Sequence, residues 1–344
     1  MASFSEIILT WYASYGRDLP WRRTTDPYAI WLSEIILQQT RIAQGTAYWE
    51  RFMERFPDVG SLAAASEDEV LRLWQGLGYY SRARNLHAAA RQIVAQGGFP
   101  STLEGIRALK GVGDYTAAAI GSFAFGLPAA VVDGNVYRVL SRVYGIDTPV
   151  GTTEAKKRFT ALAQSLLPAD RPGDFNQAMM DFGATLCTPQ NPACLTCPLR
   201  EECIALQTGR TAELPVRKAG PGIKERHFVY VYLRVDGMTA IHRRGPGDIW
   251  QGLWEPYLIE NDVIPAPAPV IPDLFRNLPP LRTGVRHQLT HQTIYADFYV
   301  CEPGFRPPLP EDFIWIPESA LSEYALPRLV LILLKETGRN LSVN

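Results

Sequence analysis

The sequence predicts a multidomain protein in which an all-α domain is followed by an α/β domain. Apolar residues recur at helical spacing up to about residue 205. A stretch rich in glycine, proline and charge then interrupts this pattern, and beyond it aromatic and β-branched residues alternate as they do in strands. A chain of 344 residues is also long enough for about two domains.

The first domain is expected to span residues 1–206. Glycine and proline divide its apolar pattern into segments that are long enough for helices. We expect this domain to be all-helical, and examples of the expected helices are residues 28–49, 81–95, 116–125, 135–144, 154–167 and 175–186.

Residues 207–225 have no apolar period and are expected to form an interdomain linker. The second domain is expected to span residues 226–344, with strands at 227–235 and 293–300 and a closing helix at 326–337. A long loop inside this domain is expected at Pro265, Pro267, Pro269 and Pro272.

The overall charge gives no sign of nucleic-acid binding, because the net charge is only −1. However, two stretches, 70–100 and 274–296, hold several arginines and no acidic residue. Such stretches are typical either of a DNA-binding track or of a solvated surface, and the residues alone leave both interpretations open. The chain has no run of about 18 uncharged apolar residues and no signal-peptide pattern, so we expect a cytoplasmic protein without a membrane segment.

Four of the five cysteines, Cys187, Cys194, Cys197 and Cys203, lie within seventeen residues. This clustering indicates a metal site rather than disulfides. Unequal gaps around a compact loop favour an iron–sulfur cluster, although a zinc ion stays possible on composition alone. The distant Cys301 is expected to be a buried, inert thiol.

Two carboxylic acids stand out by their neighbours. Glu34 has Ile30, Trp31 and Leu37 at helical spacing, and burial among them would raise its pKa, as a general acid requires. The ordinary alternative is an exposed helical glutamate. Asp133 directly precedes a predicted helix, where an aspartate commonly serves as an N-cap without any catalytic role.

Gly111 and Gly113 come shortly before the predicted helix at 116–125. Without side chains there, backbone amides can approach an anion at the positive end of the helix. The sequence therefore indicates a phosphate-binding hairpin, with an ordinary glycine turn as the alternative.

Taken together, five segments resemble the adenine DNA glycosylases of the MutY type, which belong to the helix-hairpin-helix glycosylases with an iron–sulfur cluster. They follow the family's motifs in order, although Lys110 replaces the usual proline of the hairpin. The segments are WLSEIILQQT (31–40), GLGYYSRARNL (76–86), LKGVGDYTA (109–117), VDGNVYRVL (132–140) and the array C-x6-C-x2-C-x5-C (187–203).

This resemblance implies a monofunctional glycosylase that hydrolyses the N-glycosidic bond of adenine mispaired with 8-oxoguanine or guanine and leaves an abasic site. The matching positions assign protonation of adenine at N7 to Glu34 and stabilisation of the sugar cation to Asp133, which Tyr115 and Asn135 would hold. Tyr115 stands where relatives that also cut the backbone carry a lysine, and a tyrosine cannot form a Schiff base.

The resemblance also implies a [4Fe-4S] cluster on the four clustered cysteines, with a structural and DNA-contacting role. The expected partner is double-stranded DNA with an adenine mispair, bound by a monomer. Tyr79 or Tyr80 would intercalate beside the oxidised guanine, and Asp181 would contact adenine. The implied DNA and base contacts are Trp21, Arg22, Gln38, Gln39, Thr40, Tyr79, Tyr80, Arg82, Arg84, Gly111, Gly113 and Asp181.

The second domain resembles a Nudix-like domain at residues 252–255, but no glutamate-rich metal box follows. We therefore expect recognition of oxidised guanine without hydrolysis. Leu289, Thr290 and His291 match the loop that probes the lesion, although relatives carry an aromatic residue in place of Leu289.

The expected fold is then an all-α helix-hairpin-helix glycosylase domain with an iron–sulfur cluster loop, followed by an α/β Nudix-like domain. Three alternatives stay open. They are a glycosylase for thymine mispairs or oxidised pyrimidines, a non-catalytic DNA-binding protein and a Nudix hydrolase.

Overall fold

The computed structural model describes residues 3–218, 222–260, 274 and 277–338. They form two compact units, residues 1–64 with 88–219 and residues 65–87 with 220–344. The expected proline loop at 265–272 lies outside the described residues. No helix in the described part of the chain is long and apolar enough to cross a membrane.

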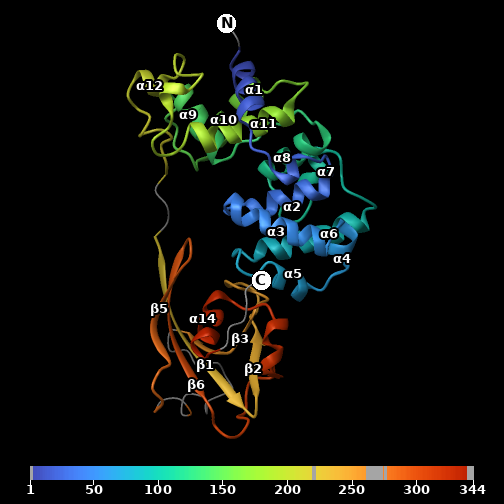
Figure 1. Ribbon diagram of the computed structural model, residues 1–344, viewed down its shortest axis with the longest axis vertical. Coiled ribbons are helices and arrows are strands. Elements are labelled where there is room, and N and C mark those ends of the chain that lie inside the picture. The colour runs from blue at the N-terminus through green and yellow to red at the C-terminus, as the bar shows by residue number, and fades with distance from the viewer. Residues whose placement is uncertain (1–2, 219–221, 261–273, 275–276, 339–344) are drawn as a thin grey trace. The chain divides into compact units, whose positions relative to one another are not determined.

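The first unit is built from helices, as predicted (Figure 1). Its first helix was not among the segments named from the sequence, although Ser3 and Glu6 form a capping box that the sequence already contains. The helices are α1 (Phe4–Tyr15), η1 (Pro20–Arg22), α2 (Pro27–Leu37), α3 (Ile42–Arg55), α4 (Val59–Ala64), α7 (Leu103–Arg107), α8 (Asp114–Phe125), α9 (Gly134–Val143), α10 (Thr153–Leu166), α11 (Pro172–Asp181), η2 (Phe182–Leu186), η3 (Cys194–Thr196) and α12 (Ile204–Gln207).

Two of the predicted helices are interrupted. The segment 28–49 is divided between α2 and α3, because the chain leaves helical geometry at Gln38 and Gln39 has a φ of 57°. No glycine or proline marks this break, so the sequence pattern did not reveal it. In the segment 175–186, α11 ends at Asp181 and the π-helical turn η2 follows.

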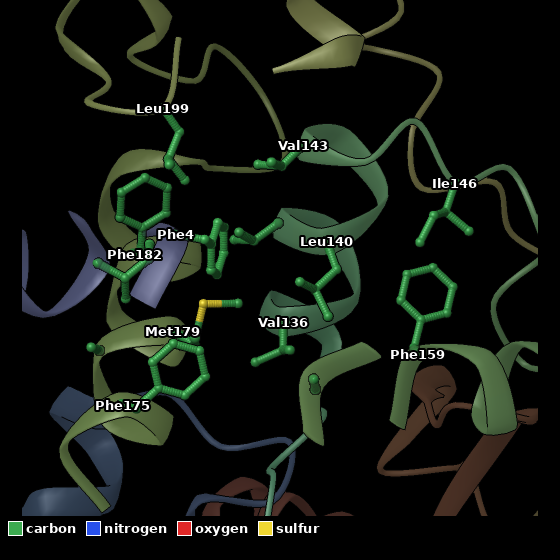
Figure 2. Close-up of a cluster of buried hydrophobic side chains, with 14 of the residues drawn as sticks. Phe4, Val136, Leu140, Val143, Ile146, Phe159, Phe175, Met179, Phe182 and Leu199 are labelled. Atoms are coloured by element: carbon green, nitrogen blue, oxygen red, sulfur yellow. The ribbon is translucent and has the colours of Figure 1, made fainter. Parts of the chain in front are cut away.

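A buried apolar cluster holds α9 in place (Figure 2). Val136, Leu140 and Val143 on α9 meet Phe175 and other side chains of α1, α10, α11 and η2. Leu199, from the cysteine-rich loop, joins the same cluster. The helix that begins after Asp133 is therefore packed in one core with that loop.

The second unit contains a seven-stranded sheet of order β3-β2-β1-β6-β5, with β4 paired to β1 and β7 paired to β2. The predicted strands are confirmed as β1 and β6, which pair in parallel from Lys224 with Gln292 to Leu233 with Cys301. The strands are β1 (Lys224–Val235), β2 (Met238–Arg243), β3 (Trp254–Glu255), β4 (Tyr257–Glu260), β5 (Arg282–Gln288), β6 (Gln292–Cys301) and β7 (Phe313–Pro317).

Helical segments complete this unit. The predicted closing helix is confirmed as α14 (Arg328–Glu336), and η4 (Glu318–Glu323) precedes it. Residues 65–87, which contain α5 (Glu67–Leu73) and the start of α6 (Ser81–Ala95), also belong to this unit. They contact the strands: Arg243 donates to Glu67 at 2.8 Å, the Trp254 indole donates to Asp68 at 3.3 Å, and the Leu326 amide donates to Gln75 at 3.0 Å.

The expected linker 207–225 is ordered over much of its length. Leu214 is buried, and Val150 exchanges backbone hydrogen bonds with Val216 and Lys218. At the other end, residues from Lys224 already belong to β1. Within residues 207–225, the described residues thus belong to folded structure over a longer stretch than the composition suggested.

Candidate active site and cysteine loop

Glu34 lies on α2, where nine of the eleven residues are buried. Its own exposure is only 6%, so the carboxyl is removed from water, as the apolar spacing predicted. Burial raises the pKa of Glu34 to about 7, with a further increase from the charge of Asp133 and opposing effects from Tyr115 and Arg22. Glu34 can therefore carry a proton near neutral pH.

Tyr115 approaches Glu34 from α8. Its hydroxyl donates to Oε2 of Glu34 at 3.0 Å. The expectation that Tyr115 would hold Asp133 is therefore not met by a hydrogen bond, although the charge of Asp133 does raise the pKa of Tyr115 after the effects of burial and Glu34. The pairing joins residues 81 positions apart, which only tertiary structure can define.

Asp133 is the N-cap of α9. Oδ1 accepts from the backbone amides of Asn135 and Val136 at 2.9 and 2.8 Å, and Oδ2 accepts from the Asn135 side chain at 2.7 Å. Burial raises the pKa of Asp133, while these donors oppose that rise. Three N–H donors favour a carboxylate at Asp133, whereas Glu34 receives one phenolic donor. The site thus combines one acid suited to carry a proton with one suited to remain an anion.

Arg138 connects this site with the cysteine-rich loop, and it was not among the predicted site residues. From α9, it donates to Oδ1 of Asn135 at 2.9 Å and to the carbonyl oxygens of Gly183 and Cys187 at 2.7 Å each. Arg138 is only 5% exposed. A continuous hydrogen-bonded path therefore runs from Asp133 through Asn135 and Arg138 to Cys187.

Replacing Arg138 with Met should lower the free energy of unfolding by about 2 kcal/mol or more, because the carbonyl oxygens of Gly183 and Cys187 lose their charged donor. Denaturant unfolding of the purified protein measures this change. Arg171→Met is the matched control, because Arg171 is half exposed and its only ion pair among the described residues is the surface pair with Asp174. Equal stability of the two variants would contradict the structural role of Arg138.

The four clustered cysteines line one hollow, together with residues that include Arg142, Phe182 and Leu186. Arg142 donates to the sulfur of Cys187 at 3.4 Å and to the carbonyl of Thr188 at 2.7 Å. Burial, followed by the charges of the other three cysteines, raises the pKa of Cys197 to about 11. Within the described residues, no three His, Cys, Asp or Glu side chains converge closely enough to hold a single metal ion. Cys301, on β6 of the second unit, is buried, as expected.

Asp181 ends α11 and is fully buried. Its two oxygens accept five hydrogen bonds, all from Arg17 and Arg22. Arg22 binds in a bidentate manner, at 2.7 and 2.8 Å, and its charge acts on Glu34. The neighbouring Trp21 is buried and lies edge-on to Trp49. Sequence reasoning missed Arg17, because no local motif distinguishes it.

The predicted hairpin lies between α7 and α8. Gly111 has a φ of 76°, which favours glycine, and Gly113 is the N-cap of α8. The next residue, Asp114, is acidic, but Lys156 and Arg107 pair with it at 2.6 and 3.5 Å. These three charged side chains stand at a cavity of about 680 Å³, which Tyr115 also lines.

The break between α2 and α3 carries the three polar residues that were predicted to contact DNA. Gln38 donates to Thr116 on α8 at 3.3 Å, and Thr40 donates to the carbonyl of Gln38 at 3.4 Å. Gln39, between them, has the left-handed backbone described above. The break therefore places these side chains on a turn instead of along one long helix.

In the second unit, a cavity of about 340 Å³ brings together residues 78–81 and 288–292 with Trp250. The hydroxyls of Tyr79 and Thr290 form a hydrogen bond. Tyr79 is 43% exposed and has a φ of 46°, whereas Tyr80 is buried, so Tyr79 is the ring available for stacking on a base. Trp250 was not predicted as a site residue, although it lies just before the predicted Nudix-like segment at residues 252–255.

The remaining predicted contacts lie in the same unit as this cavity. Leu289, Thr290 and His291 form the turn between β5 and β6, and Leu289 is half-buried while the other two are exposed. Arg84 donates to the backbone and side chain of Gln251. Arg82 packs over the rings of Trp74 and Tyr79. The structure thus gathers both predicted lesion-recognition segments in one unit.

Comparison with protein families identifies two matching segments. Residues 32–165 match the HhH-GPD superfamily of base excision DNA repair proteins, and residues 229–336 match the NUDIX domain. Both catalytic carboxyl candidates lie in the first segment, and the turn at residues 289–291 lies in the second.

Similar proteins and structures agree with these matches. The chain is 36% identical over 254 residues to an adenine DNA glycosylase of Buchnera aphidicola (from Schizaphis graminum), covering 73% of each chain. It is 44% identical to the adenine DNA glycosylase of Mus musculus over 65% of this chain, but this match spans about half (46%) of the mouse protein. The solved structure of a thermostable thymine-DNA glycosylase is similar with a TM-score of 0.55 and 31% identity, over 60% of this chain and 95% of that chain.

Proposed function

The chain belongs to the adenine DNA glycosylase family, and on this basis we propose that it hydrolyses the N-glycosidic bond of adenine mispaired with 8-oxoguanine or guanine. The observation that carries the proposal is the pair of Glu34 and Asp133, one suited to hold a proton and the other surrounded by N–H donors. Cleavage of such a bond needs both a proton for the leaving base and a negative charge beside the sugar cation.

The proposed reaction begins when adenine turns out of the duplex into the helical unit. Glu34 gives its proton to N7 of the base, and the bond between N9 and C1′ breaks with its electron pair going to the base. The carboxylate of Asp133 stabilises the positive sugar. Glu34, now ionised, accepts a proton from the attacking water, and the products are free adenine and an abasic site.

Tyr115 supports a monofunctional reaction. The phenol lies against Glu34 and has no amine with which to attack C1′ as a Schiff-base nucleophile does. We therefore propose that strand cleavage needs added alkali.

The four clustered cysteines fit the [4Fe-4S] cluster that the resemblance implies. They line one hollow, and their unequal gaps along a compact loop favour a cluster with several metal atoms over a single zinc ion. When bound, such a cluster would hold the loop together and needs no redox change. Arg142, which donates to Cys187, places a positive charge beside the thiolates.

The cavity at Tyr79 and Thr290 is proposed to read the base opposite adenine. Thr290 offers a hydroxyl for polar atoms of an oxidised guanine, and the exposed ring of Tyr79 can stack on a neighbouring base. Double-stranded DNA with an adenine mispair is accordingly the proposed substrate, and the protein would act as a monomer.

Single-turnover excision tests the proposal. Duplexes with adenine opposite 8-oxoguanine, guanine or thymine are compared with a duplex that holds thymine opposite guanine, each with and without alkali. Release of adenine from the purine mispairs, with strand cleavage only after alkali, is the expected result. Release of thymine instead would favour the alternative suggested by the similar thymine-DNA glycosylase structure, and no release of any base would exclude a glycosylase.

The pH dependence of this reaction follows from Glu34. Its pKa is about 7 in the folded protein, so the proton is present below that pH and is lost as the pH rises. We expect kcat/KM to fall about tenfold for each pH unit above the midpoint, because kcat/KM reports ionisations of the free enzyme. Rate measurements from pH 5.5 to 9 check this, and a rate that stays constant up to pH 9 would contradict the role of Glu34 as the acid.

A further inference from the structure

We propose that Trp250 and Asp248 are positioning residues for the turn at residues 289–291, and that they thereby determine how strongly the protein prefers 8-oxoguanine to guanine opposite adenine. The inference rests on the proposed function, because it concerns the base that the cavity beside this turn is proposed to read. Neither residue belongs to the segments that resemble the family, and neither was predicted as a site residue.

The indole ring of Trp250 packs against the strand that leads into the turn. Its centre lies 5.7 Å from that of the His287 ring on β5, and 6.2 Å from that of the Phe228 ring on β1. Burial lowers the pKa of His287, so its ring is neutral near pH 7 and packs on an aromatic neighbour without a charge. Trp250 itself is only 9% exposed, so it supports the turn and does not reach out to a base.

Asp248 is connected through Arg226 on β1 to the strand that leaves the turn. Two nitrogens of Arg226 donate to the two oxygens of Asp248 at 2.7 and 2.6 Å. One of them, Nη1, also donates to Oε1 of Gln292 at 3.3 Å, and Gln292 directly follows the turn as the first residue of β6. Arg226 is buried, and its paired hydrogen bonds fix its orientation. Residues 248–250 are thereby tied to both strands that flank the turn.

Residues 248–250 are themselves held in a strained conformation. Trp250 has a φ of 58°, in the left-handed region that residues other than glycine rarely adopt. Arg244 fixes this segment, because it donates to Oδ2 of Asp248 at 2.6 Å and to the carbonyl of Ile249 at 3.0 Å. Such a conformation persists only where the surroundings enforce it, and it is often found beside ligand sites. The adjacent site here is the cavity of about 340 Å³ that the turn also lines.

The turn depends on this support because its own side chains are little packed. Thr290 and His291 are exposed. Backbone hydrogen bonds close the turn, from the amide of Leu289 to the carbonyl of Gln292 at 2.8 Å and from the amide of Lys224 to the carbonyl of His291 at 3.0 Å.

The position of the turn matters because the two bases differ little. 8-Oxoguanine has a hydrogen on N7 and an oxygen on C8 that guanine lacks, so a protein distinguishes them by polar atoms placed within hydrogen-bonding distance of these two positions. Hydrogen bonds weaken steeply when their geometry is lost. A turn that is free to shift would therefore bind the two bases more alike.

Equilibrium binding tests the proposal with duplexes that carry 2′-fluoro-2′-deoxyadenosine, whose glycosidic bond resists cleavage, opposite guanine or 8-oxoguanine. The quantity measured is the preference, defined as the Kd with guanine divided by the Kd with 8-oxoguanine. Trp250→Leu removes the ring from His287 but stays apolar. We expect the preference to fall about fivefold, as for the loss of one hydrogen bond.

Two further substitutions of tryptophan separate positioning from a general loss of packing. Trp250→Phe keeps an aromatic ring beside His287 and should keep more than half of the preference. Trp315→Leu is the matched control, because Trp315 is half-buried on β7 of the same unit and does not line the cavity. It should leave the preference unchanged.

Asp248→Asn tests the second support, because asparagine keeps the shape of the side chain but loses the charge that pairs with Arg226 and Arg244. The preference should fall by roughly threefold or more. Asp236→Asn is the control for this variant, because Asp236 is exposed between β1 and β2 and asparagine tolerates its positive φ. It should bind both duplexes as the unsubstituted protein does.

A direct measurement of the turn does not depend on DNA. The methyl group of Thr290 can be observed by NMR in protein labelled with ¹³C-methyl threonine, with the signal assigned by its absence in Thr290→Ser. We expect this signal to shift or broaden in Trp250→Leu and in Asp248→Asn, but not in the two controls.

Each outcome decides one point. Equal weakening of binding to both duplexes in Trp250→Leu, with an unchanged preference, would overturn the proposal, and so would a Thr290 signal that stays in place in both variants. If the unsubstituted protein binds the two duplexes equally, it has no preference to determine and the proposal fails. If it prefers 8-oxoguanine but releases no adenine, the proposed reaction fails, whereas the binding preference still tests the role of Trp250 and Asp248.

Discussion

Replacing Glu34 with Gln should reduce the single-turnover rate of adenine release by about 10³-fold, within the range that general acid catalysis contributes. Glutamine has nearly the same shape and can still accept the hydrogen bond from Tyr115, but it has no acidic proton to give to the base. The rate of the variant should be the same at pH 6 and pH 7, because it has no ionisation in this range at position 34, whereas the rate of the unsubstituted protein already falls towards pH 7 as Glu34 loses its proton. Quench-flow or manual sampling of labelled duplex measures the rate.

The stability of the same variant separates catalysis from folding. Glu34 is buried, so the neutral glutamine removes the cost of an ionised buried group above the pKa of Glu34. The thermal midpoint of Glu34→Gln at pH 8 should therefore equal or exceed that of the unsubstituted protein. Glu50→Gln, on the exposed face of α3, is the control that should change neither property. A Glu34→Gln protein that keeps a tenth of the normal rate would refute the assignment.

The second large effect is expected for Asp133→Asn, with a rate of adenine release lowered by about 10²-fold or more, since a charge that stabilises the sugar cation is lost. Asparagine is about as good an N-cap as aspartate, so the free energy of unfolding should change by less than about 1 kcal/mol. Asp133→Ala should lose the same activity and about 1 kcal/mol more stability. Single-turnover rates and denaturant unfolding measure the two quantities.

These variants decide between the two roles that the sequence left open for Asp133. Thr152→Ala provides the matched control, because Thr152 caps α10 through the amide of Ala155 and has no part in the site. It should lose stability without losing activity. If Asp133→Asn cleaves at the normal rate, Asp133 is only a helix cap.

Local sequence patterns could predict Glu34 and Asp133 because the cause of each position is itself local. The apolar spacing around Glu34 predicts burial, and an aspartate before a helix predicts the hydrogen bonds to Asn135 and Val136. For the same reason the paired strands β1 and β6 were predicted, since alternation of aromatic and β-branched residues is a property of each strand alone.

The contacts that organise the site depend on residues far apart in the chain. Tyr115 was expected to hold Asp133, yet it donates to Glu34, and a choice between two nearby carboxyl groups depends on how α8 packs on α2. Arg138 and Arg17 were missed because an arginine that donates to residues far away in the chain has no sequence signature until its acceptors are known. The break at Gln39 was missed for a related reason, because a non-glycine residue adopts the left-handed region there.

The division of the chain into units has a consequence for its modularity. The two family matches, at 32–165 and 229–336, follow one another along the sequence and do not overlap. The second compact unit contains residues from both matches, because residues 65–87, which lie within the first match, fold with the strands. Cleaving the chain between the two matches would therefore not give two independent domains, because residues 65–87 would be separated from the strands with which they fold. Residues 65–87 hold the second unit through the hydrogen bonds of Glu67, Asp68 and Gln75, so a Nudix-like domain without partners for these side chains would lose those contacts.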